Sequence, residues 1–210
     1  MSHVDPNLTT RPVLDDDDDE DEEKKGGGAG DFVARGLLKR RVIMVTKPVD
    51  RDLMSSVVSQ LLLLDNEDPE ARITMYVNCP GGDADSGFGI YDAMRFIKAP
   101  ITTVCMGLAA SAAIIIFLGG EKGKRYTLPH SRFLIHQPSS GAQGQASDLE
   151  ITANEIIKTR DKYNQIIEDE IGVAAAKIVE DAHRDFWLSA ADAVGYGLAD
   201  KVVQSRNELA

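Results

Sequence analysis

The feature that most constrains the fold is a run without a single charged residue, residues 99–120 (APITTVCMGLAASAAIIIFLGG). About 18 apolar residues suffice to cross a membrane, so the run has to be tested as a membrane span. Gly107 interrupts it after the β-branched segment 101–106, and two glycines close the apolar segment 111–118. We therefore predict a buried strand over 101–106, a buried helix over 111–118 and no membrane span.

Strand-like and helix-like segments alternate around this run. Strands are expected at 42–46, 73–77, 125–128 and 132–135, and helices at 50–64 and 86–97. Strands separated by helices within one domain need crossover connections, which favours a mostly parallel sheet. The expected fold class is α/β, and 210 residues suit one domain with an appendage.

A long helix is predicted over residues 146–171, where charged residues leave only a thin apolar stripe. Its members are Leu149, Ile151, Ile156, Ile157, Ile166 and Ile167. A helix this polar cannot be packed fully inside its own domain, so it either projects or meets another subunit. A further helix is expected over 174–181, a capped helix after Ser189, and a last apolar segment over 198–203.

The N-terminal residues differ in composition from the rest of the chain. Nine consecutive acids occupy 15–23, and a glycine-rich segment follows at 26–30. Such a stretch repels itself and has nothing to bury. We predict a disordered acidic arm with a glycine hinge over 1–30 and a folded domain over 31–210.

The composition also narrows the partners and the compartment. The net charge is −11 and no basic patch is present, which argues against nucleic acid. Cys79 and Cys105 cannot form a disulfide framework and lie in apolar runs, which suits a reducing compartment. The first residues do not have the pattern of a signal peptide, so a cytoplasmic location is expected.

Ser111 is a candidate nucleophile because it lies where the buried strand gives way to the buried helix, among alanines. Free amide groups at such a junction stabilise a developing negative charge. The alternative is a serine that simply caps the helix.

His136 and Asp185 are the candidate partners of Ser111. His136 ends a short apolar strand, and the alternative for it is a satisfied core histidine. Asp185 precedes Phe186 and Trp187, so we expect a partly buried and paired carboxylate; the alternative is a surface ion pair with Arg184. The histidines have no metal-ligand spacing, so no metal site is expected.

The loop 78–82 (NCPGG) must turn tightly and expose amide groups. It has no phosphate-binding pattern, but it suits a donor to a reacting carbonyl oxygen. Cys79 is a weak rival as nucleophile, because nothing nearby in the sequence would lower its pKa.

These segments together resemble the ClpP family of caseinolytic serine peptidases, from Phe32 to about Arg206. The resemblance rests on YVNCPGG (76–82), CMGLAAS (105–111), GKR (123–125), LP (128–129), IHQP (135–138), GQA (144–146), RD (184–185) and YGL (196–198). It implies a ClpP/crotonase-like spiral of strand and helix units from which the long helix projects.

The resemblance also implies roles for particular residues. Ser111 would be the nucleophile, His136 the general base and Asp185 the residue that orients the histidine, with the backbone amides of Gly82 and Ala112 as the oxyanion hole. A partner-docking groove would be formed by Tyr76, Phe96, Met106, Tyr126 and Leu128.

Family members form barrels of two stacked seven-membered rings, with the long helix between the rings. The resemblance therefore implies self or paralogous subunits, an AAA+ unfoldase of the ClpX, ClpA or ClpC type, and unfolded polypeptide as substrate. ATP would be used by the unfoldase, so no cofactor is expected for this chain.

Three departures from the family pattern stand out. Ala112 replaces a common methionine, His183 replaces a common acid near Asp185, and the N-terminal arm does not look like the family's axial loops. Within the groove, Thr74 stands where an aromatic residue is common. Two alternative functions remain: a catalytically weak structural paralogue in a mixed barrel, or a crotonase-like acyl-CoA enzyme. Crotonase chemistry needs oxyanion donors but no Ser, His and Asp set.

Overall fold

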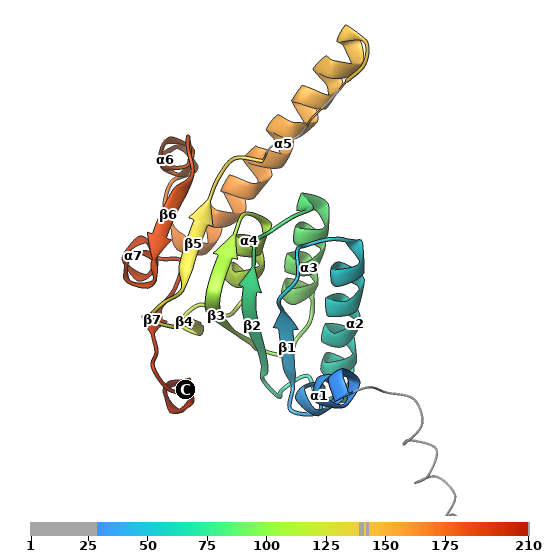
Figure 1. The fold of residues 1–210 in the computed structure, drawn as a ribbon, viewed down its shortest axis with the longest axis vertical. Coiled ribbons are helices and arrows are strands. Elements are labelled where there is room, and N and C mark those ends of the chain that lie inside the picture. Colours follow the sequence, from blue (N-terminus) through green and yellow to red (C-terminus); the bar gives the residue numbers. More distant parts are fainter. Residues whose placement is uncertain (1–28, 139–140, 142, 210) are drawn as a thin grey trace, which may run out of the picture. The chain divides into compact units, whose positions relative to one another are not determined.

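The computed structural model describes residues 29–138, 141 and 143–209 (Figure 1). The chain divides into two units, residues 1–36 and 37–210. Helix α1 (Ala29–Leu38) begins in the first unit and ends at the second residue of the second. The predicted acidic arm lies almost wholly outside the described residues. Helix α1 includes Gly30, the last glycine of the predicted hinge. The second unit contains all the candidate site residues.

The second unit is built on a mostly parallel sheet, as predicted. Its strands are β1 (Val42–Val45), β2 (Ile73–Cys79), β3 (Ile101–Ala110), β4 (Arg125–Thr127), β5 (Arg132–Ile135), β6 (Phe186–Ser189) and β7 (Lys201–Val202). The order is β1-β2-β3-β4-β7, and β5 pairs with both β3 and β6. Among these strands only the β5–β6 pair is antiparallel. The α/β class is therefore confirmed.

Strand β3 is longer than the sequence predicted, and it changes partner halfway. Thr103–Cys105 pair with β4, whereas Leu108–Ala110 pair with β5. The prediction that Gly107 ends the strand was wrong, because its φ of 105° lets the chain bend and continue. A Cβ on Gly107 would lie 2.7 Å from the side-chain oxygen of Asn78, so the bend needs glycine. This bend carries β3 on to Ser111.

The helices follow the predicted periodicity, and apart from α5 their bounds differ from the predicted ones by one to a few residues. They are α2 (Arg51–Glu67), α3 (Ala84–Phe96), α4 (Ala112–Leu118), α5 (Ala146–Ile171), α6 (Ala175–Asp181) and α7 (Ala190–Tyr196), and a 3-10 turn, η2 (Arg206–Glu208), follows β7. The carboxylates of Asp50 and Asp83 accept hydrogen bonds from backbone amides in the first turns of α2 and α3. The Ser189 capping box of α7 is confirmed.

The core lies around α4, which is buried along its whole length as expected. Helices α2, α3, α4 and α5 pack one against the next, and Phe117 of α4 stacks edge-on against Phe133 of β5. The charge-free run is thus a strand and a short helix. In the described residues no helix is both long and apolar enough to cross a membrane.

Helix α5 has the predicted bounds and two different halves. Its C-terminal half packs on the domain through Tyr163, Asn164, Ile167 and Glu170, whereas Leu149, Ile151 and Ile157 of the N-terminal half are exposed. A buried ion pair between Glu170 and Arg125 of β4 fixes the packed end, and the Tyr91 hydroxyl donates to Glu170 at 2.7 Å. In Figure 1 the other end of α5 extends beyond the sheet. The expectation that this helix is not packed fully inside its own domain is confirmed.

Candidate active site

Ser111 lies at the junction of β3 and α4, in a backbone conformation that side chains seldom adopt. Its φ is 56° and its ψ is −126°, and its side chain makes no capping hydrogen bond to the helix. Such a conformation costs about 1–3 kcal/mol and persists only where the surroundings hold it. The interpretation of Ser111 as an ordinary helix cap therefore does not account for its geometry.

The loop after β2 holds Ser111 from the other side. Gly81, with a φ of 86°, approaches so closely that a Cβ there would lie 2.6 Å from the Ser111 Cβ and 2.5 Å from the Ala110 carbonyl oxygen. The Ser111 amide donates to the Leu134 carbonyl at 2.9 Å, and the Tyr163 hydroxyl donates to the Ser111 carbonyl at 3.1 Å. Three separate elements thus fix the strained residue.

The two residues predicted for the oxyanion hole lie beside Ser111. Gly82 sits in a parallel bridge with Val49, where a Cβ would lie 2.2 Å from the Val49 carbonyl oxygen. Ala112 is the first residue of α4, and the opening amides of a helix have no acceptor within it. Both residues line the same cavity as Ser111. The sequence prediction for Gly82 and Ala112 is compatible with this geometry.

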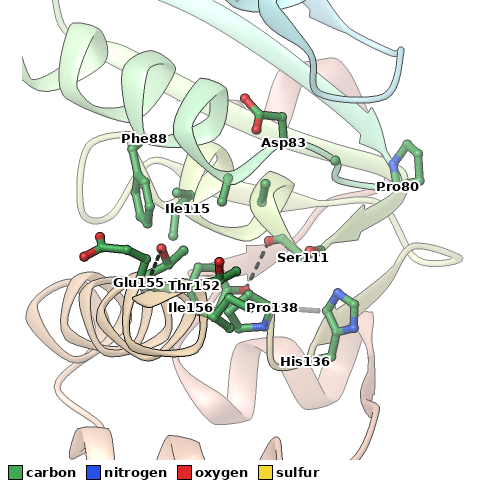
Figure 2. Close-up of a pocket in the computed structure, with 15 residues that line it drawn as sticks. Pro80, Asp83, Phe88, Ser111, Ile115, His136, Pro138, Thr152, Glu155 and Ile156 are labelled. Atoms are coloured by element: carbon green, nitrogen blue, oxygen red, sulfur yellow. Dashed lines mark hydrogen bonds between the residues drawn. The ribbon is translucent and has the colours of Figure 1, made fainter. Parts of the chain in front are cut away.

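His136 follows β5 and faces Ser111 across this cavity (Figure 2). The cavity measures about 520 Å³, and the His136 side chain is 32% exposed. A histidine on the wall of an open cavity is not a satisfied core residue. The apolar wall consists of Phe88 from α3, Ile115 from α4 and Ile156 from α5.

Asp185 is placed differently from the sequence prediction. We expected a partly buried carboxylate against aromatic rings, but its side chain is 64% exposed. Strand β6 begins at the next residue, and its rings pack elsewhere: Phe186 stacks on Tyr196, and Trp187 lies under the guanidinium of Arg132.

The Asp185 carboxylate nevertheless has a nearby partner in the described part of the chain, and this partner is the His136 ring rather than Arg184. The distance from His136 Nδ1 to Asp185 Oδ1 is 3.8 Å, which is longer than a hydrogen bond. His136 also lines a second cavity that includes Asp185, His183 and Arg184. The histidine thus lies between the serine cavity and the aspartate.

Helix α5 contributes to the cavity, which the sequence pattern alone did not lead us to expect. Five of its residues line the wall: Thr152, Glu155, Ile156, Thr159 and Tyr163. They recur at the three- and four-residue spacing of one helix face, a signal that is present in the sequence. Ile156, a member of the predicted apolar stripe, is one of these residues and lines the cavity of its own chain.

The two cysteines are buried, as predicted, and neither is disulfide-bonded. Burial raises the pKa of the Cys79 thiol, and the thiol lies 3.1 Å from the Lys47 carbonyl oxygen. The Gly81 amide also donates to this sulfur at 3.4 Å, so Cys79 supports the glycine loop. A neutral, buried thiol is a poor nucleophile. Nowhere in the described ranges do three His, Cys, Asp or Glu side chains gather as metal ligands would.

Three of the five residues predicted for the docking groove lie together in this chain. Tyr76, Tyr126 and Leu128 gather around Val104 and Val203 in a small apolar cluster that is separate from the main core. Met106 is partly buried outside that cluster, and Phe96 stands 81% exposed at the end of α3.

Comparisons with known proteins agree with this architecture. Residues 25–206 match the family model of Clp protease. The chain is 45% identical to the ATP-dependent Clp protease proteolytic subunit of Deinococcus radiodurans over 172 residues, which is 82% of this chain and 84% of the relative. A point mutant of ClpP1 from Listeria monocytogenes superposes with a TM-score of 0.78 and 34% identity, over 85% of this chain and 99% of that one.

The family match and the fold define the class as a serine-type peptidase. Within that class, this chain belongs to the Clp protease family.

Proposed function

We propose that this chain is the proteolytic subunit of an ATP-dependent Clp protease and that it hydrolyses unfolded polypeptides. The observation that carries the proposal is Ser111, held in a strained conformation on the wall of a cavity that it shares with His136. The name of the Deinococcus relative supports the coarser statement of a proteolytic subunit.

In the proposed mechanism the Ser111 hydroxyl oxygen attacks the carbonyl carbon of the peptide bond. His136 takes the hydroxyl proton and then donates it to the leaving amine, which releases the first product and leaves an acyl-enzyme. Water then attacks the ester, with His136 again as general base. The amides of Gly82 and Ala112 stabilise the negative oxygen in both steps.

Asp185 orients His136 in this scheme. Its carboxylate is 3.8 Å from Nδ1, and the Asp185 side chain is largely exposed, so we expect it to rotate and shorten this distance when substrate binds. Catalytic hydrogen bonds are often long before substrate binds. The aspartate then selects the tautomer whose other nitrogen faces the serine.

The assembly we propose is a ring-forming oligomer, of one or two kinds of subunit, joined through the exposed half of α5. Its apolar side chains Leu149, Ile151 and Ile157 are exposed in the single chain. An AAA+ unfoldase docks on the oligomer, hydrolyses the ATP and delivers the substrate, so the peptidase needs no cofactor of its own. The free thiols of Cys79 and Cys105 are compatible with the reducing cytoplasm that we propose as its location.

Hydrolysis of a short fluorogenic peptide by purified oligomer tests the function. We expect His136→Ala to abolish turnover, and Asp185→Asn to lower it by orders of magnitude, about 10⁴-fold in the well-studied Ser-His-Asp case. His183→Ala, a change in the cavity that contains Asp185, is the matched control and should retain turnover. Full activity of His136→Ala would contradict the mechanism, and acyl-CoA turnover would indicate the crotonase alternative.

A further inference from the structure

The segment 205–209 folds back onto the small apolar cluster beside the docking groove. Leu209 packs against the cluster formed by Val104, Tyr126 and Val203, on which Tyr76 and Leu128 also pack. The tyrosine cluster is the name we use below for Val104, Tyr126, Val203, Tyr76 and Leu128. Three of its members, Tyr76, Tyr126 and Leu128, are residues of the predicted docking groove. A side chain of the chain itself therefore lies against the groove.

The segment reaches the cluster through a built turn. The Glu208 carboxylate accepts the amide hydrogens of Gln204 and Ser205, each at 3.0 Å, and closes a capping box with Ser205. Lys201 of β7 places its Nζ 3.3 Å from the same carboxylate. These contacts hold the pKa of Glu208 below its usual value. The turn fixes the direction in which Leu209 leaves it.

The contact between Leu209 and the tyrosine cluster is weak enough to be broken. The Lys201 and Glu208 side chains are 55% and 33% exposed, and ion pairs of this kind contribute little to stability. Beyond the turn, one partly exposed leucine supplies the apolar contact. A partner segment that buries more apolar surface can therefore displace Leu209 without unfolding the sheet.

We propose that residues 205–209 form a latch, in which Leu209 occupies part of the surface where the AAA+ unfoldase docks. The unfoldase binds the tyrosine cluster through an apolar side chain that takes the place of Leu209. Because only the released form is competent, the apparent Kd for the unfoldase equals the intrinsic Kd divided by the fraction of time that the latch is open. This inference rests on the proposed function of the chain.

The direct test compares the affinity of full-length oligomers for a ClpX-type unfoldase. We expect Leu209→Ser to lower Kd about 3- to 10-fold, the range that a latch closed for roughly 70–90% of the time would produce. Glu208→Gln, which removes the charge that pairs with Lys201, should lower Kd less. Asn207→Ala is the matched control, since Asn207 lies exposed in the same turn. Cleavage of a short peptide should be equal in the wild type and the three variants.

A second measurement detects the latch without the unfoldase. The hydrophobic dye bis-ANS should bind better to oligomers of Leu209→Ser than to those of Asn207→Ala, because the tyrosine cluster is uncovered. Equal dye binding, together with equal or weaker unfoldase affinity, would overturn the latch while peptidase activity leaves the proposed function intact. A wild-type oligomer without peptidase activity would instead contradict the proposed function.

Discussion

Ser111 and Gly81 approach each other so closely that a Cβ on Gly81 would lie 2.6 Å from the Ser111 Cβ. Both residues are held in place, because Ser111 joins β3 to α4 and the Gly81 carbonyl accepts a hydrogen bond from the Val49 amide at 2.9 Å. We expect Gly81→Ala to displace the serine and to reduce kcat/KM for peptide hydrolysis at least about 100-fold, since displacements of about 1 Å have effects of that size.

Gly123→Ala is the matched control for this prediction. Gly123 has the same φ of 86° but nothing within 4 Å of an added Cβ, so it carries the backbone strain without the collision. Both variants should lose some thermal stability, but only Gly81→Ala should also lose peptidase activity. Equal peptidase activity in the two variants would show that the Gly81 contact does not position Ser111.

Tyr163→Phe should lower both stability and activity. Its hydroxyl donates to the Ser111 carbonyl at 3.1 Å, and loss of one such bond costs about 0.5–1.5 kcal/mol. Tyr196→Phe removes a hydrogen bond to the Asp181 carboxylate, at 2.9 Å, away from the serine. Urea unfolding should show a loss of stability for both variants, whereas kcat should fall only in Tyr163→Phe. A similar kcat for both variants would contradict a positioning role.

Because the Cys105 thiol is buried, we predict that the folded chain loses stability at alkaline pH. Burial raises its pKa from 9.0 to about 12, so the folded chain keeps a proton that the unfolded chain releases. The protonated Cys105 thiol therefore makes its full contribution to the free energy of unfolding below pH 9. That contribution is lost as the pH rises toward 12, at up to about 1.4 kcal/mol per pH unit. The urea midpoint should fall less steeply between about pH 9 and 11 in Cys105→Ala. Parallel curves for wild type and variant would contradict the assignment.

We predict that polar substitutions in the exposed half of α5 weaken the oligomer. Ile151 and Ile157 are 62% and 44% exposed in the single chain, so aspartate at both positions should leave the subunit folded and weaken the oligomer. Asn154→Asp adds a charge at an exposed, polar position of the same helix and is the control. Analytical ultracentrifugation should show smaller species only for the isoleucine variant. An unchanged mass would place the interface elsewhere.

Most elements could be predicted from the sequence because periodicity and caps are local signals. Helix α5 and the strand before His136 have their predicted bounds, and the strand that leads to Ser111 begins where it was predicted. The exchange of partners within β3 could not be predicted, because the bend at Gly107 depends on Asn78 of a neighbouring strand. A glycine in a strand does not show in the sequence whether the strand ends or bends.

The candidate site, too, could be predicted from the sequence only in part. The junction at Ser111 followed from local pattern, but its positive φ depends on Gly81, Leu134 and Tyr163, which come from three other segments. The exposure of Asp185 was predicted wrongly because the two rings that follow it pack on other residues, Phe186 on Tyr196 and Trp187 on Arg132. Asp185 itself lies outside β6, so these rings do not bury its carboxylate.

The most direct test of the central claim is intact-mass analysis after reaction with a fluorophosphonate, which modifies activated serines. We predict one adduct per wild-type chain, located on Ser111 by peptide mapping, and none in Ser111→Ala or His136→Ala. Ser86→Ala, which changes a serine buried at the start of α3, should still be labelled. Undiminished labelling of Ser111→Ala, or an adduct on another residue of the wild type, would contradict the assignment of Ser111 as the nucleophile.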